Sequence, residues 1–145
     1  MKVGEVMHRG AITAMADEPL PPVAERMGER RVGCVVVLKQ GKVAGILTER
    51  DILRKVVARN KTPARIQVRD VMSAPVTTVT SGTDLDEATA LMAEQRIRRL
   101  PVVDGGKLVG MLSSSDVVCF LPQMDKILLD MELKAEGSAA KPKKR

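Results

Sequence analysis

Short apolar runs and stretches with helical spacing follow one another along the chain, and their order predicts its elements. Apolar runs at Gly33–Leu38 and Val43–Leu47, with Gly41 between them, predict two strands joined by a tight turn. The stretch before them carries apolar residues three and four positions apart, as on one face of a helix: Leu20, Val23, Ala24, Met27. An extended segment at Ala11–Ala14 and a helix beginning at Thr48 complete a strand–helix–strand–strand–helix unit.

This unit occurs twice. A shift of 65 residues aligns the chain with itself without a gap, and fourteen of the 49 aligned positions, from Val3 to Asp51 in the first copy, are identical. The second copy has its extended segment at Val76–Val79 and its strands at Leu100–Val103 and Leu108–Leu112. A unit of about 60 residues leaves one face of its sheet uncovered. We therefore expect the two copies to pack sheet to sheet about a pseudo-twofold axis, with a cleft between them.

The predicted fold class is α+β, with two tandem β-α-β-β-α repeats. The first repeat is predicted at residues 1–62, and the second at 63–133 together with a C-terminal helix. Residues 134–145 hold five basic residues and one acidic residue without hydrophobic periodicity, and we expect a disordered basic tail. The first helix of the second repeat is predicted to begin at Thr83, with Asp86 completing a capping box.

Each repeat ends its second strand with the same motif: Gly, two apolar residues, a hydroxyl residue, two variable residues and Asp. The two copies are Gly45–Asp51 and Gly110–Asp116. One interpretation is structural, because Thr48 or Ser113 followed by an acid is typical of a helix start. The other is a nucleoside site, in which the carboxylate accepts hydrogen bonds from two ribose hydroxyls and the helix start faces a phosphate. The presence of the motif in both copies favours the second interpretation.

Composition narrows the function classes. Hydrophobic residues make up 44% and charged residues 29%, which is typical of a globular protein. The longest apolar runs are about five residues against the roughly 20 of a membrane helix, and the first residues lack a secretory pattern. We therefore expect a cytoplasmic protein without a membrane span. Phe120 is the only aromatic residue, so the stacking platforms that hold single-stranded nucleic acid are missing.

Catalytic chemistry and metal binding are not expected. His8 is the only histidine, and the two cysteines, Cys34 and Cys119, lie far from it in the sequence. No group has metal-ligand spacing, and no acid–base constellation can be assembled around one histidine. The chain has 24 Lys and Arg against 18 Asp and Glu, and much of the excess is in the tail. Nucleic-acid contact through the tail therefore stays open as an alternative, beside a merely solubilising role.

In this order, twice and at a fixed offset, the motifs resemble the CBS-domain family, in which two tandem repeats form a Bateman module. The residues that carry the resemblance are Asp70–Met72, Arg99–Asp104 and the two motifs ending in Asp. The resemblance implies a regulatory module, not an enzyme, that binds an adenosine-containing ligand between its repeats. AMP ranks first, ADP and ATP follow, and S-adenosylmethionine is compatible. It also implies a homodimer and a protein partner that detects occupancy; a ligand-free dimerisation scaffold is the alternative.

The resemblance also implies roles for individual residues. Ribose binding falls to the motif acids and hydroxyls: Asp51, Asp116, Thr48, Ser113. Adenine contact falls to positions on or near the first extended segment of each repeat: Ile12, Thr13, Val76, Thr77, Thr78. Phosphate contact falls to Arg98 and Arg99, and Arg50 beside the first motif is a further candidate. Gly33 and Cys34 stand where the second repeat has these two arginines, so the two half-sites are expected to differ in phosphate preference.

Overall fold

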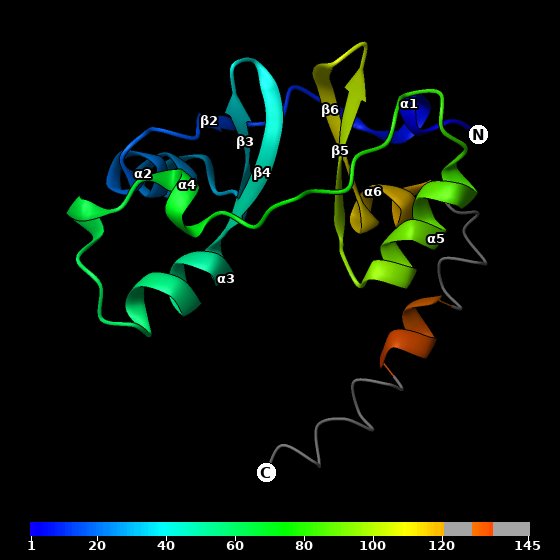
Figure 1. The fold of residues 1–145 in the computed structure, drawn as a ribbon. Helices are drawn as coiled ribbons and strands as arrows, with labels where there is room; N and C mark the ends of the chain where they lie inside the picture. The colour runs from blue at the N-terminus through cyan, green and yellow to red at the C-terminus, as the bar shows by residue number, and fades with distance from the viewer. Residues whose placement is uncertain (121–128, 135–145) are drawn as a thin grey trace.

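Two three-stranded sheets form the centre of the protein, which the computed structural model describes over residues 1–120 and 129–134 (Figure 1). The first sheet has the order β2-β3-β4, with bounds Thr13–Met15, Cys34–Lys39 and Lys42–Thr48. The second has the order β1-β6-β5, with bounds His8–Arg9, Lys107–Ser113 and Arg99–Asp104. The strands β4 and β6 face each other between the two halves (Figure 1). The predicted α+β class is therefore confirmed.

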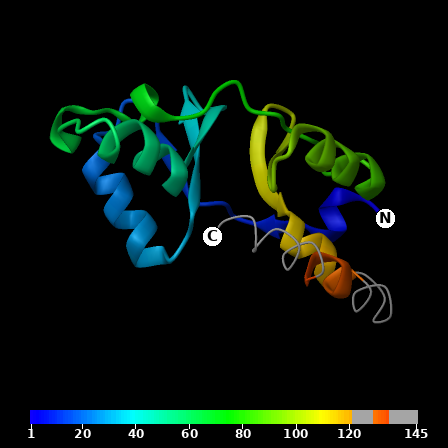
Figure 2. The same cartoon turned by 90° about the horizontal axis from the view of Figure 1, so that it is seen from below.

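The helices lie around these sheets, and the two long ones cover the outer sides of their own sheets (Figure 2). The long helices are α2 (Leu20–Arg30) and α5 (Leu85–Gln95). Short helices stand before and after the strands: α1 (Val3–Val6), α3 (Glu49–Ile52), α4 (Val68–Val71), α6 (Ser114–Cys119). A π-helical turn at Leu53–Val57 continues α3, a 3₁₀ turn occupies Pro63–Arg65, and residues 129–134 are helical.

The predicted hairpin strands are confirmed with small shifts of their ends, but two expectations for the second repeat are wrong. The extended segment at Val76–Val79 forms no strand, and only Val79 makes a single parallel bridge, to Val102. The helix starts at Leu85, after the N-cap Asp84, without a side-chain cap. Thr83 does not cap it, because its hydroxyl accepts the backbone N–H of Thr80 at 3.1 Å and closes a turn.

The two halves of the structure exchange their opening segments. In α1, Val3 and Val6 belong to the core of the second half, beside Leu100 and Leu112. The counterpart α4 belongs to the core of the first half, as Figure 1 shows by its place beside α2. The predicted limits, 1–62 and 63–133, describe the sequence repeats. The two hydrophobic cores do not follow these limits, because each core includes the opening helix of the other repeat. Every half is therefore completed by a segment from the other repeat.

The C-terminal region is described only in part. The predicted C-terminal helix includes residues 121–128, and the predicted basic tail includes residues 135–145; both stretches lie outside the described residues. Within the helical residues 129–134, Met131 and Leu133 are exposed. None of the helices in the described part of the chain is both long and apolar enough to cross a membrane.

Candidate functional site

Both motifs form helix N-caps, as the structural interpretation predicts. The Thr48 hydroxyl accepts the N–H of Asp51 at 3.1 Å, and Asp51 Oδ2 accepts the N–H of Thr48 at 3.0 Å. In the second motif, Ser113 and Asp116 make the same two bonds at 3.2 and 2.8 Å. Each acid is buried, and one of its carboxylate oxygens, Oδ2, accepts a hydrogen bond at the start of its own helix. The other oxygen, Oδ1, is the one left for further partners.

The Oδ1 atom of Asp51 has two donors in the described structure. The Ser73 hydroxyl donates to it at 2.8 Å, and Lys55 Nζ lies 3.2 Å away. Burial of the carboxylate raises the pKa of Asp51, but the bonds from Ser73, Thr48 and Lys55 together outweigh it and leave the pKa below its ordinary value. Asp51 is therefore a buried, ionised acceptor whose second oxygen, Oδ1, is held by Ser73 and Lys55.

The glycine at the start of each motif allows the exchanged segment to approach. The backbone of Ser73 pairs with that of Ile46, and a Cβ on Gly45 would lie only 2.7 Å from the Ser73 carbonyl oxygen and 2.9 Å from Met72 Sδ. In the second half, a Cβ on Gly110 would overlap the carbonyl of His8 in the same way. Glycine is needed here for close packing, because neither position has a positive φ.

A cleft of about 780 Å³ opens beside Asp51 and is lined by both repeats. Seven of the predicted site residues line it: Thr48, Arg50, Asp51, Val76, Thr77, Arg98, Arg99. Arg98 comes just before β5 and Arg99 is its first residue. The alternation of side chains along a strand therefore does not separate them, and both line the cleft. The structure thus brings the hydroxyl and acid of the first motif together with the arginines of the second repeat.

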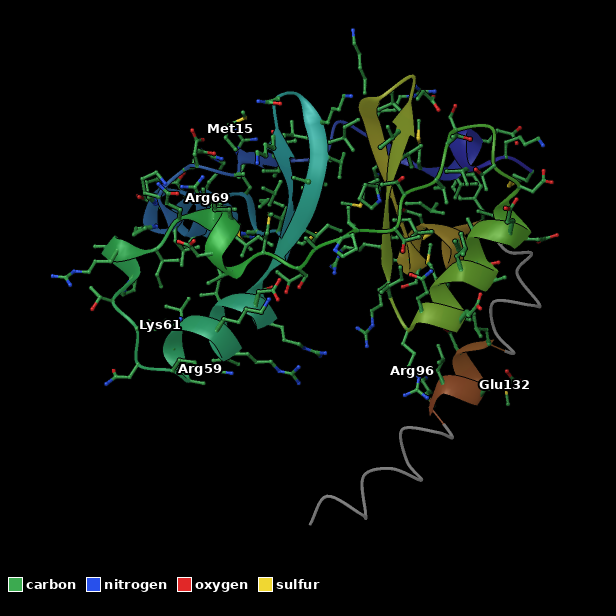
Figure 3. The ribbon with its side chains drawn as sticks, in the orientation of Figure 1. Met15, Arg59, Lys61, Arg69, Arg96 and Glu132 are labelled. Atoms are coloured by element: carbon green, nitrogen blue, oxygen red, sulfur yellow. The ribbon has the colours of Figure 1, made fainter. Side chains whose placement is uncertain are left out.

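The cleft carries more positive charge than expected from the sequence. Its lining has six basic side chains and two acidic ones, Glu49 and Asp51, a formal charge of +4. Three of the basic residues were not predicted: Arg54, Lys55, Arg96. Arg96 follows the end of α5 (Figure 3). The helical spacing of four that separates Arg54 from Arg50, and Lys55 from Asp51, is the sequence signal that points to the first two.

The other five predicted residues do not line this cleft: Ile12, Thr13, Thr78, Ser113, Asp116. The carbonyls of Ile12 and Thr13 are already used, since they accept the Val36 N–H at 3.0 Å and the Arg26 guanidinium at 2.9 Å. The Oδ1 atom of Asp116 is in contact with His8. The described residues contain no group of three or more His, Cys, Asp or Glu side chains arranged to hold a metal ion.

The depressed pKa of Asp51 gives a prediction for stability in acid. An acid whose pKa is lower in the folded state contributes stability above its unfolded pKa of about 4 and loses it as the pH falls through the folded value. Ser73→Ala removes one of the bonds that depress the pKa, so Asp51 should protonate at a higher pH. Thermal unfolding measured across the acid range should show the loss beginning at higher pH in the variant. Identical acid profiles would contradict this role of Ser73.

Comparison with known proteins defines the class to which this fold and cleft belong. The CBS-domain profile matches residues 3–58 and 68–122, and the chain belongs to the CBS-domain family. It is 40% identical over 126 residues to an uncharacterised Methanopyrus kandleri protein, covering 86% of this chain and 64% of that protein's length. It is 32% identical over 115 residues to the CBS domain-containing protein YhcV of Bacillus subtilis, covering 79% and 81%.

Solved structures agree with this assignment. A putative signal-transduction protein with CBS domains from Burkholderia ambifaria superposes with a TM-score of 0.74 at 35% identity, covering 81% of this chain and 91% of that one. A CBS-CP12 protein from bloom-forming cyanobacteria, described as hexameric, has a TM-score of 0.74 at 26% identity, covering 98% and 85%. Proteins with paired CBS repeats are in general regulatory ligand-binding modules, and members of the family oligomerise.

Proposed function

We propose that this chain is a regulatory module that binds an adenine nucleotide in the cleft beside Asp51. The observation that carries the proposal is the composition of that cleft, in which a ribose-type acceptor from one repeat faces a group of arginines from the other. A ligand that contacts both repeats stabilises one arrangement of the halves, and a partner protein can detect that arrangement. The proposed role is regulatory and includes no catalytic step.

Asp51 would bind the ribose through its Oδ1 atom. In the free protein this oxygen accepts from Ser73 and Lys55. Two vicinal ribose hydroxyls can replace these donors. The buried carboxylate then keeps its hydrogen bonds, and the free-energy cost of a buried, unpaired charge is avoided. The Lys55 ammonium also donates to the Val71 carbonyl at 3.0 Å, so it would stay beside the ribose, where it can contact a phosphate in the same cleft.

The adenine would lie against aliphatic side chains. Ile46, Pro75, Val76 and Ile97 all line the cleft, and no aromatic residue does. Burial of a flat base against such walls is favourable by area alone, at roughly 25 cal/mol per Å² of apolar surface. The backbone at Val76 and Thr77 is free of strand pairing, so its N–H and C=O groups are available to the edge of the base.

The charge of the cleft predicts that affinity increases from AMP to ADP to ATP, although the family resemblance ranks AMP first. Exposed ion pairs each contribute about 0.2–1 kcal/mol, so each added phosphate should strengthen binding about 1.5- to 5-fold. The advantage of ATP should fall as salt is added. Titration calorimetry of the three nucleotides at low and high salt measures this. Arg98→Ala with Arg99→Ala should reduce the ATP-to-AMP ratio; an unchanged ratio would contradict the role of these arginines.

The proposal itself is tested first on the purified protein. Because the chain has no Trp or Tyr, a bound adenine would dominate its ultraviolet spectrum near 260 nm. We expect mass spectrometry of the denatured protein to identify an adenine nucleotide, or calorimetry to detect binding of AMP, ADP, ATP or S-adenosylmethionine. If none of these ligands is found or binds, the adenine-nucleotide proposal fails and a ligand-free scaffold is the better description.

A homodimer remains a prediction. The apolar helix residues Met27 and Met92 are buried in the two cores and are therefore not available to a second copy. Leu53 and Val57, after α3, are exposed and border an apolar groove along α2. Light scattering of the full chain measures the oligomeric state.

A further inference from the structure

The two motif acids have different partners on the same oxygen. The Oδ1 atom of Asp51 accepts a bond from the small Ser73 hydroxyl and is paired with the Lys55 ammonium. The Oδ1 atom of Asp116 instead lies 2.5 Å from Nε2 of His8. The imidazole side chain of His8 is 76% exposed, whereas the side chain of Asp116 is 7% exposed. His8 therefore stands between Asp116 and solvent.

This difference lies in the side chains and not in the backbone. His8 and Ser73 are 65 residues apart and occupy equivalent positions in the repeat. His8 pairs with Met111 in the second half, and Ser73 pairs with Ile46 in the first, which is again the same offset. Each segment approaches the glycine of the motif it faces with its carbonyl group. A histidine and a serine thus occupy equivalent backbone positions beside the two motifs.

We infer that His8 makes the two half-sites unequal by occupying the ribose acceptor of Asp116, so that the chain binds one nucleotide, beside Asp51. This inference rests on the proposed function, because it assigns the same ribose role to both acids. An imidazole is larger than a serine hydroxyl and fills the space in front of the carboxylate. Its Nε2 is in contact with the Oδ1 atom that ligand hydroxyls would have to reach, so a ligand must displace the ring to bind Asp116.

The second half-site also differs in charge. The positions that correspond to Arg50, Arg98 and Arg99 are Ser115, Gly33 and Cys34. The position that corresponds to Lys55 is Phe120. Of the six basic residues of the first cleft only Arg96 has a basic counterpart, Arg31. With His8 removed, this half-site would offer a ribose acceptor with far fewer cations to hold phosphates. The ligand that fits it is a nucleoside, and adenosine is the suitable probe.

The test exchanges the two side chains in the full-length protein. His8→Ser gives Asp116 the hydroxyl that Asp51 has, and we expect calorimetry to show a second equivalent of adenosine with the first equivalent of ATP retained. Ser73→His gives Asp51 the imidazole that Asp116 has, and we expect ATP to bind at least tenfold more weakly. Circular dichroism and thermal unfolding of both variants verify that they are folded. The double exchange should move the preferred ribose site to the second half.

The outcomes separate the inference from the proposal on which it rests. If the unaltered protein binds one ATP and neither exchange changes stoichiometry or affinity, His8 has no such role and the proposed function stands. If the unaltered protein binds nothing but His8→Ser binds adenosine, the single nucleotide beside Asp51 is ruled out, and only the blocking role of His8 at Asp116 stands. If two equivalents already bind with His8 in place, or no variant binds any adenosine ligand, the inference is overturned.

Discussion

Asp51→Asn is expected to weaken ATP binding about 10- to 100-fold. The carboxylate is buried, its pKa is depressed, and in the proposed function its Oδ1 atom accepts the ribose hydroxyls. Hydrogen bonds to a charged group contribute about 1.5–3 kcal/mol, and each 1.4 kcal/mol corresponds to a factor of ten. The amide keeps the shape of the side chain but removes the charge. Titration calorimetry with ATP measures the loss directly.

The matched control is Asp116→Asn, which changes the equivalent acid in an equivalent helix cap. Both substitutions alter a bond to the N-cap backbone, so their effects on folding should be similar. Only Asp51 lines the cleft, and Asp116→Asn should leave ATP affinity within about twofold of that of the unaltered protein. Equal losses from both substitutions would place the effect in folding and contradict a specific ribose contact at Asp51.

Gly45→Ala is expected to lower the free energy of unfolding by about 1–3 kcal/mol, the usual cost of overpacking. The added Cβ would lie 2.7 Å from the Ser73 carbonyl oxygen, which belongs to the backbone and cannot rotate away. The exchanged segment would have to shift, and with it the Ser73 hydroxyl that holds Asp51. The variant should therefore lose nucleotide affinity as well as stability, and thermal unfolding with calorimetry measures both.

Gly28→Ala provides the control for this substitution. Gly28 lies inside α2, has no unusual backbone angle, and a Cβ there meets no atom within 4 Å. Alanine is favoured over glycine in a helix interior by about 1 kcal/mol, so this variant should be as stable as the unaltered protein or more stable. If Gly45→Ala were equally harmless, the close approach of the exchanged segment would not be a constraint on the fold.

Much of the fold was predictable because its signals are local. The apolar runs of the strands, the turn at Gly41 and the helical spacing of apolar residues in α2 each depend on residues only a few positions apart. The second copy shows where this fails. The expected strand at Val76–Val79 is reduced to one bridge, and Thr83 closes a turn instead of capping α5. In both places the local pattern allows more than one structure, and tertiary contacts choose between them.

The candidate site was predicted in part. The motif pattern identified Thr48 and Asp51, and the resemblance to the family identified the arginines at 98 and 99, all of which line the cleft. The spacing of four residues between Asp51 and Lys55 is a sequence signal for their contact, because residues four apart lie on the same face of a helix. No sequence signal points to Ser73, because it is 22 residues from Asp51 along the chain and contacts it only in the folded structure.

The repeat, the class of fold and the two capped acids follow from the sequence alone, since each depends on residue types at fixed short spacings. The tertiary structure decided which segment completes which half. It placed Ser73 on Asp51 and His8 on Asp116, although His8 lies more than a hundred residues from its acid along the chain. Contacts of this range depend on the path of the whole backbone, and no local pattern encodes them. The sequence shows that the two motifs are equivalent, and their partners differ because the exchanged segments bring a serine to one acid and a histidine to the other.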